Sequence, residues 1–219
     1  MGLPCGTLNE YYKQDMAIVR TRLQWLMLIG FLALMFSLPL FAGERAVSLI
    51  NTINIIIIAV LGLNILTGLC GQISLGHAAF IAVGAYTTGI LASRLGLSIW
   101  VTLPCAALST GLIGIIFGLP SLRLKGFYLI MATVAAQFII SFVIIQLPQY
   151  TGGGSGLVVP AAQVGGIKIV GEQSCYFLIL PITIMMVFFA KNLARTRAGR
   201  AFIAIRDNDL AAEVMGINI

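Results

Sequence analysis

The side chains that could do chemistry in this sequence gather in one short stretch, GLCGQISLGHAAF, at residues 68–80. It contains the single histidine of the chain, His77, together with Gln72, Ser74 and three glycines, all inside a hydrophobic tract spanning residues 47–92. Imidazole, amide and hydroxyl groups can hydrogen-bond a ligand, and irregular backbone can offer it further N–H and C=O groups. Two interpretations are open. These polar residues border a ligand path, or they cap helix ends where the glycines allow a tight turn.

A second set of polar residues lies further along the chain. Thr133, Gln137 and Ser141 recur every four residues in an apolar segment, which predicts a polar stripe along one helix. Such a stripe either lines a polar path or hydrogen-bonds neighbouring helices. Asn51 and Asn54 form a shorter pair with the same two interpretations.

Small residues form a third pattern, in the apolar segment between these two sets. Ala107, Gly111, Gly114 and Gly118 are spaced by three or four positions. This spacing predicts a face on which another helix packs closely.

Several classes of chemistry lack the residues that they need. The cysteines are scattered, without disulfide-framework or metal-ligand spacing, so the sequence predicts no metal site; they are Cys5, Cys70, Cys105 and Cys175. We find no paired carboxylates and no nucleophile–histidine constellation, which argues against an enzyme. No apolar segment has a charged residue at its centre, which argues against an ion-coupled carrier.

The composition shows in which medium these residues must be positioned. Hydrophobic residues make up 59% of the chain and charged residues only 9%, and the mean hydropathy is +1.03. A globular protein has about 25% charged residues, so most of this surface must face lipid. The net charge of +6 comes from basic residues between apolar blocks, which suits membrane topology and not nucleic-acid binding.

Helices long enough to cross the bilayer must therefore carry the polar residues. A hydrocarbon core of about 30 Å needs about 20 apolar residues in a helix. Five blocks meet this length clearly and a sixth does so weakly; they are residues 23–42, 47–67, 98–119, 126–147 and 174–190, and the weaker 69–92. The first block is longer than a signal-peptide core and lacks a small-residue cleavage site, which favours an uncleaved span. The predicted fold class is an all-α polytopic membrane protein with about six transmembrane helices.

The basic residues decide between six crossings and five. With six crossings and a cytoplasmic N-terminus, ten of the 13 basic residues lie inside, whereas five crossings would leave only five of them there. Because cytoplasmic loops are enriched in Lys and Arg, six crossings are favoured. The inside set is Lys13, Arg20, Arg22, Arg123, Lys125, Lys191, Arg195, Arg197, Arg200 and Arg206, and the outside set is Arg45, Arg94 and Lys168.

This topology divides the chain into three parts. Residues 1–22 form a cytoplasmic N-terminal segment, residues 23–191 form the transmembrane domain, and residues 192–219 form a cytoplasmic segment. The external loop at residues 148–173 is rich in glycine and has an arm typical of a hairpin; it serves as a slack linker or as a docking surface.

The C-terminal segment predicts a short amphipathic helix. Asp207, Asn208 and Asp209 are alternative N-caps, and Gly216 is a typical stop. Leu210, Val214 and Ile217 fall on one face of this helix, which can grip another protein or lie in the lipid interface. Its acidic residues oppose anionic headgroups.

Four motifs, in order, resemble a known family: GLNILTGLCGQISLGHAAFIAVGAYT, LRLKGFYLIMATVA, TGGGSGL and TRAGRAFIAIRDNDLAAEVMGIN. They look like the permease subunits of branched-chain amino acid ABC importers, of the high-affinity leucine/isoleucine/valine type. The resemblance runs from about Val47 to the last residue, and the final motif is the most specific. Asp207 and Asp209 stand where glutamates are more usual in this family.

The resemblance implies a function, partners and site residues. The chain would be a transport subunit of the bacterial plasma (inner) membrane without a cofactor of its own. It would work with separate ATP-binding cassette subunits, a second homologous permease and an external, periplasmic substrate-binding protein. The resemblance places the ATPase-coupling candidates in the C-terminal segment; they are Arg200, Arg206, Asp207, Asp209, Glu213 and Gly216. The path candidates come from polarity and spacing instead; they are Gln72, Ser74, His77, Thr133, Gln137 and Ser141.

Some alternatives stay open. Related permeases carry urea or short amides, and the four motifs do not separate these substrates. A secondary carrier or channel is the competing class. Family members continue with further spans beyond the coupling segment, which implies that this chain is truncated at its C-terminal end.

Overall fold

The computed structural model describes residues 22–121, 124, 126–161, 163–164 and 167–217. The predicted N-terminal segment, apart from Arg22, lies outside these residues, as do the topology signals Arg123 and Lys125.

Six of the described helices are long and apolar enough to cross a membrane, which confirms a polytopic helical membrane protein. They are α2 (Arg22–Phe41), α3 (Glu44–Asn64), α4 (His77–Leu95), α5 (Ile99–Ser121), α6 (Phe127–Gln146) and α8 (Glu172–Leu193). A π-helical turn, η1 (Ile65–Leu69), extends α3. The weak sixth block was predicted at residues 69–92, but its helix begins only at His77 and continues to Leu95. Composition hides this start because Cys70, Ile73 and Leu75 continue the apolar pattern although the backbone of residues 70–76 is irregular.

Shorter elements join and follow these helices. They are α7 (Pro148–Thr151), the 3₁₀ turn η2 (Gly153–Ser155), β1 (Gln163–Val164), β2 (Ile167–Lys168), α9 (Arg197–Asp207) and α10 (Asp209–Val214). The two strands form the predicted hairpin, with Val164 opposite Ile167 in antiparallel register.

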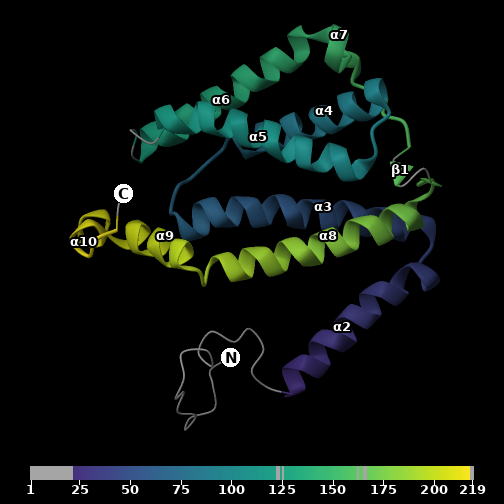
Figure 1. Ribbon diagram of the computed structural model, residues 1–219, viewed down its shortest axis with the longest axis horizontal. Helices are drawn as coiled ribbons and strands as arrows, with labels where there is room; N and C mark the ends of the chain where they lie inside the picture. The colour runs from purple at the N-terminus through teal and green to yellow at the C-terminus, as the bar shows by residue number, and fades with distance from the viewer. Residues whose placement is uncertain (1–21, 122–123, 125, 162, 165–166, 218–219) are drawn as a thin grey trace.

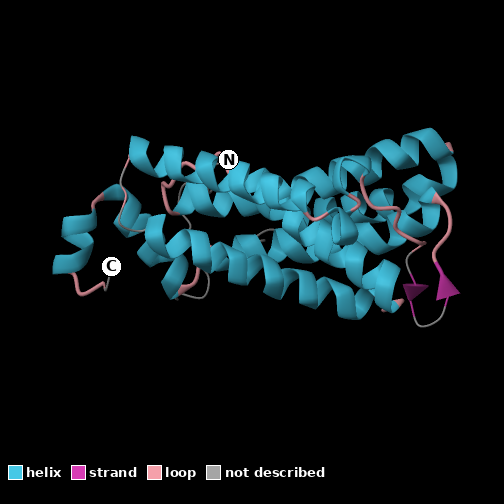
Figure 2. Cartoon of the chain, turned by 90° about the horizontal axis from the view of Figure 1, so that it is seen from above, coloured by secondary structure: helices cyan, strands magenta, loops and turns pink. Residues whose placement is uncertain are grey.

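Five of the long helices form two layers, with α4, α5 and α6 in one and α3 and α8 in the other, and α2 runs obliquely away from α8 (Figure 1). In both views α3 and α8 extend along the long axis of the molecule (Figure 1 and Figure 2). The connection from η1 to α4, the end of α8, and α9 and α10 lie at one end, which we call the α9 end. The connections that contain α7 and the β-hairpin lie at the opposite end, which we call the hairpin end.

Each layer has its own cluster of buried side chains. Val47 of α3 packs on Tyr176 and Leu180 of α8, and the Tyr176 hydroxyl donates to the Met35 carbonyl of α2 at 2.7 Å. In the other layer, Ala79 and Val83 of α4 pack on Ile140 of α6.

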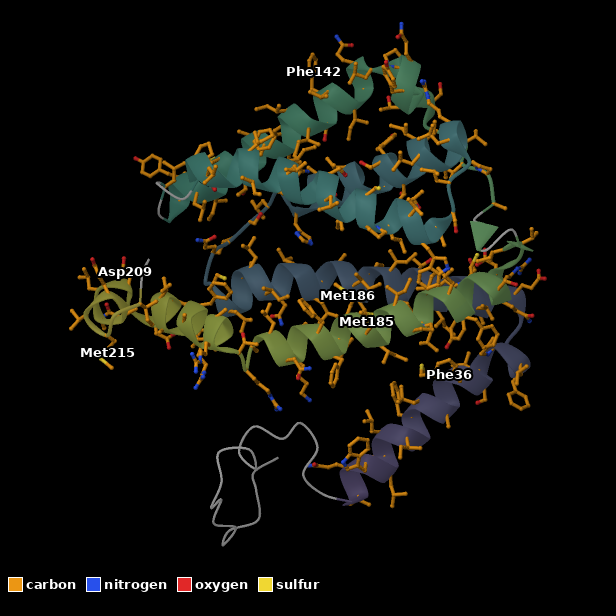
Figure 3. The ribbon with its side chains drawn as sticks, in the orientation of Figure 1. Phe36, Phe142, Met185, Met186, Asp209 and Met215 are labelled. Atoms are coloured by element: carbon orange, nitrogen blue, oxygen red, sulfur yellow. The ribbon has the colours of Figure 1, made fainter. Side chains whose placement is uncertain are left out.

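The outer surface of the bundle is apolar, as a lipid environment requires. Phe142, which is 62% exposed, projects from the outer face of α6 (Figure 3). Met185 on α8 is 72% exposed.

Candidate functional site

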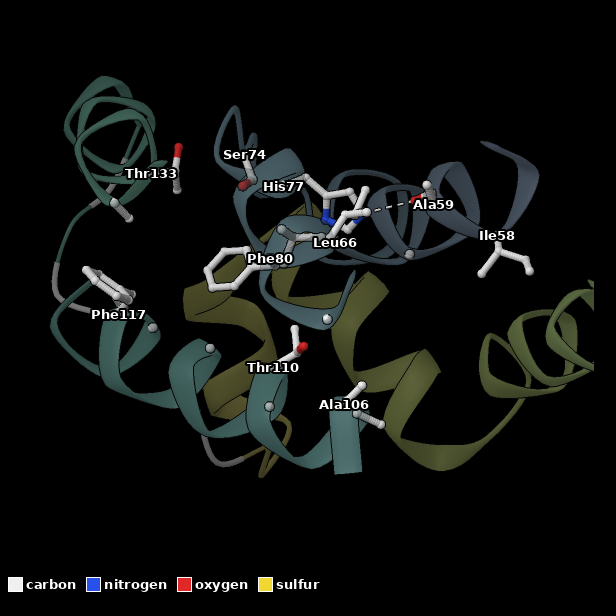
Figure 4. Close-up of a pocket in the computed structure, with 18 of the residues that line it drawn as sticks. Ile58, Ala59, Leu66, Ser74, His77, Phe80, Ala106, Thr110, Phe117 and Thr133 are labelled. Atoms are coloured by element: carbon white, nitrogen blue, oxygen red, sulfur yellow. Dashed lines mark hydrogen bonds between the residues drawn. The ribbon is translucent and has the colours of Figure 1, made fainter. Parts of the chain in front are cut away.

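A cavity of about 880 Å³ lies among five of the long helices (Figure 4). Its walls come from α3, α4, α5, α6 and α8 and from residues 72–74. Most lining side chains are apolar, such as Ile58, Phe80 and Phe117, and none of them is charged.

The glycine-rich stretch forms the polar part of this wall. Gln72, Ser74 and His77 all line the cavity, and Ser74 is buried. The chain leaves η1 and reverses at Gly71, whose φ of +70° favours glycine, before α4 begins at His77. The structure therefore brings the three predicted residues together.

The His77 ring reaches back to the C-terminal part of α3. Its Nε2 lies 3.0 Å from the Ala59 carbonyl oxygen, and a Cβ added at Gly62 would lie 3.3 Å from its Cε1 (Figure 4). Because a carbonyl oxygen accepts, Nε2 is the donor in this contact. Ala59 precedes the end of η1 by ten residues, which is about 15 Å along a helix. Residues 70–76 thus return alongside α3, with Ser74 and Gly76 buried and Ile73 and Leu75 exposed.

Thr133 lines the cavity and also connects α6 to the segment that precedes α4. Its hydroxyl accepts from the Leu75 N–H at 3.2 Å and donates to the Ile130 carbonyl at 2.8 Å. A Cβ added at Gly76 would lie 2.4 Å from the Thr133 carbonyl oxygen, so only glycine permits this approach. The two interpretations of the stripe are therefore compatible at this residue.

The other two members of the stripe lie elsewhere. Gln137 is half-buried and Ser141 is exposed, and neither is among the cavity-lining residues. Ala136 and Ile140 instead follow Thr133 on the buried face. Residues four apart drift by about 40° around a helix, so Ser141 has turned well away from Thr133.

The small residues of α5 do not pack as the sequence predicts. A Cβ added at Gly111, Gly114 or Gly118 meets nothing within 4 Å, and all three residues line the cavity. Within the described part of the chain, their lack of side chains provides space and not a helix contact.

The asparagine pair lies nearer the start of α3 than the cavity-lining residues Ile58, Ala59 and Gly62. Asn51 and Asn54 are both buried, and Asn51 Nδ2 donates to the Glu172 backbone carbonyl of α8 at 3.0 Å and to its carboxylate at 3.1 Å. This pair does not line the cavity; for Asn51, the contacts correspond to the predicted interhelical hydrogen bonding. Among the described residues, no three His, Cys, Asp or Glu side chains come together as metal ligands would.

A smaller cavity of about 280 Å³ continues the space towards the hairpin end. Ala85, Thr88 and Leu103 line both cavities, and residues 159–161 of the loop line the smaller one. A Cβ added at Gly89 would lie 2.9 Å from Leu157 Cδ2, so this loop packs directly on α4. Periodicity could not reveal this contact, because the loop has no regular pattern.

The C-terminal segment forms two helices where the sequence predicts one. Thr196 caps α9 by accepting from the Gly199 N–H at 3.2 Å, a start that the sequence analysis missed. Asn208 is the N-cap of α10, accepting from the Ala211 N–H at 3.1 Å, and Gly216 ends it with φ +83°. The extended backbone of Asn208 separates the two helices.

The predicted coupling residues spread over both helices. Arg200 and Glu213 are exposed, Asp209 is half-buried at the start of α10, and Arg206 pairs with Asp207 at 2.8 Å. Leu210 and Val214 are 71% and 87% exposed, so the apolar face of α10 is uncovered.

The family described as the permease component of branched-chain amino acid transport systems matches residues 45–219. The chain is 28% identical, over 219 residues, to the high-affinity branched-chain amino acid transport system permease protein LivM of Escherichia coli (strain K12). Its identity to LivM of Salmonella typhimurium is also 28%. Each alignment covers 89% of this chain and 52% of the relative, so the chain spans about half the length of these curated relatives. No solved structure matches the chain.

Proposed function

Because the chain belongs to the family of branched-chain amino acid permease components, we propose that it is a membrane-spanning subunit of an ABC importer for these amino acids. The observation that carries this proposal is the cavity, whose apolar walls meet polar groups near the α9 end. The cavity would be part of the translocation path.

The chemistry of the walls favours an aliphatic substrate. Side chains such as Ile58, Phe80 and Phe117 can surround a branched alkyl group, with about 25 cal/mol gained per Å² of apolar surface removed from water. Gln72, Ser74 and His77 can hydrogen-bond the amino and carboxylate groups. Urea offers no alkyl group to such walls and a short amide only a small one, so the amide-permease alternative is the weaker one.

The free energy for transport would come from partner chains. An ion-coupled carrier would need charged groups in its path, and among the described residues none that lines the cavity is charged. We therefore place ATP-binding cassette subunits at the α9 end, against the exposed apolar face of α10. Its charged flanks Arg200, Asp207 and Glu213 would fix the register, while Asp209 begins α10 and Gly216 ends it.

This placement sets the orientation of the molecule. The α9 end would face the cytoplasm of a bacterial cell, with the N-terminus on the same side of the plasma membrane. The hairpin end, with the external loop at residues 148–173, would receive substrate from an external binding protein. A second homologous permease would complete the path, which would open alternately to each side.

The proposal is tested in the cell that encodes the protein. Deleting its gene should reduce saturable uptake of leucine, isoleucine and valine, and expression of the protein should restore it. Urea uptake is the matched control and should not change. A tagged protein should co-purify with ATP-binding subunits. Unchanged leucine uptake, or loss of urea uptake alone, would contradict the proposal.

A further inference from the structure

Arg206, in the last turn of α9, reaches the glycine-rich stretch at the end of α3. Its Nη1 donates to the Gly68 carbonyl oxygen at 2.7 Å. Its Nε and Nη2 donate to Asp207 Oδ1 at 3.0 and 2.8 Å. The aliphatic part of the side chain lies on Gly71, where an added Cβ would be 2.4 Å from Arg206 Cγ.

The chemistry of each partner suits an arginine at this place. Gly68 lies in the π-helical turn that ends α3, where carbonyl groups lack helical partners and the helix dipole is negative. A guanidinium has donors in a fixed fork, so it can bind a carbonyl on one side and a carboxylate on the other. The pair with Asp207 is exposed and adds little stability by itself, so its effect is to orient the guanidinium.

The segment beyond this contact is the polar wall of the cavity. Gln72 and Ser74 line the cavity only a few residues after Gly71. At its far end the segment is fixed to α6, through the bond from Leu75 N–H to Thr133. Residues 68–76 are thus bound to α9 at one end, through Arg206, and to α6 at the other, through Thr133.

We propose that Arg206 is a positioning residue that links α9 to the polar wall of the cavity, so that a displacement of α9 moves Gln72 and Ser74. This assigns Arg206 a partner within the chain, where the sequence suggests a contact with an ATPase. The link itself follows from the contacts above, whereas its use in transport rests on the proposed function.

Cys70 lies within the linked segment and reports on it. Burial raises the pKa of its thiol, so the thiolate that reacts with a maleimide is scarce at neutral pH. Cys105, on α5, is half-buried and far from the link in sequence, which makes it a control for global unfolding.

The first test measures maleimide labelling in membranes that contain the full chain. One form keeps only Cys70 and another only Cys105, with serine at the other cysteines. Arg206→Ala should raise the Cys70 rate severalfold and leave the Cys105 rate unchanged. Arg197→Ala, at an exposed arginine in the first turn of the same helix, should change neither rate.

The conservative variant keeps this test decisive. Arg206→Lys retains the charge but not the fork of donors, so its Cys70 rate should lie between those of the parent form and Arg206→Ala. If Arg206→Ala unfolds the protein, the labelling rates of both Cys70 and Cys105 rise. Arg206→Lys then tests the link by itself: the link predicts a higher labelling rate at Cys70 and an unchanged rate at Cys105. An unchanged Cys70 rate in a folded variant would overturn the link.

The second test asks whether the link moves. In the assembled complex, the Cys70 rate should differ between the nucleotide-free state and a state trapped with ATP and vanadate, and Arg206→Ala should abolish this difference. Equal rates in the two states of a complex that still imports leucine would overturn the positioning role while the proposed function stood. If no form of the complex imported leucine, the proposed function would be wrong. The first labelling test would still show whether Arg206 binds the Gly68 segment.

Discussion

At the scale of single residues, His77 tests whether the polar residues of the glycine-rich stretch border a ligand path or have only a structural role. Its ring lines the cavity and also bonds the Ala59 carbonyl. His77→Leu should remove this bond, at a cost of about 1 kcal/mol, and should place an apolar group at the polar wall. Leucine uptake per assembled complex should fall severalfold while the amount of complex stays close to that of the parent. Reduced assembly with normal uptake per complex would assign His77 a structural role only.

Gly76 tests the packing of the polar wall on α6. Gly76→Ala places a Cβ 2.4 Å from the Thr133 carbonyl oxygen, so backbone must shift, at a cost of about 1–3 kcal/mol. The midpoint of thermal unfolding in detergent should fall by several degrees. Gly114→Ala is the matched control, because nothing lies within 4 Å of its added Cβ. Equal midpoints for the two variants would show that the close approach of Gly76 to α6 is absent.

At the scale of elements, the sequence predicts where helices cross the membrane better than what their faces contact. Apolar length predicts five of the crossings clearly, because lipid requires about 20 such residues whatever the neighbours are, and the distribution of basic residues favours the sixth. The start of α4 and the break at Asn208 escape prediction, since each depends on local backbone geometry.

The candidate site was predictable only where polarity contrasts with an apolar surrounding. Gln72, Ser74 and His77 stand out for this reason, and the structure brings them to one wall. The apolar wall could not be predicted, because a side chain such as Phe80 or Phe117 would serve equally in a core. The rotation of a helix about its axis decides whether a given side chain lines the cavity or packs on a neighbouring helix. This rotation depends on helices that are distant in sequence.

The wall of α5 provides a prediction at this scale. Gly114→Leu should fill part of the cavity, because this glycine faces open space inside it, and should reduce leucine uptake without lowering the unfolding midpoint. Gly30→Leu is the control, since Gly30 on α2 also has nothing within 4 Å but does not line the cavity. Normal uptake by Gly114→Leu would place the translocation path elsewhere.

At the scale of the whole molecule, we expect the hairpin end and the α9 end to lie on opposite sides of the membrane. In a form without native cysteines, Val170→Cys at the hairpin end should react with an impermeant maleimide in intact cells. Arg197→Cys at the α9 end should react only after permeabilisation. Val170 is 72% exposed and Arg197 is also exposed, so neither change disturbs a core. Labelling of Arg197→Cys in intact cells would invert the proposed orientation.

The most direct measurement of the central claim is ATP-driven uptake of radiolabelled leucine into vesicles. These vesicles contain the permease complex purified from its own cell, with ATP on the side of the α9 end and loaded binding protein on the other. We expect uptake that requires hydrolysable ATP, that unlabelled isoleucine and valine inhibit, and that urea does not inhibit. Leucine uptake that proceeds equally without ATP, or that is absent while urea is transported, would contradict the account.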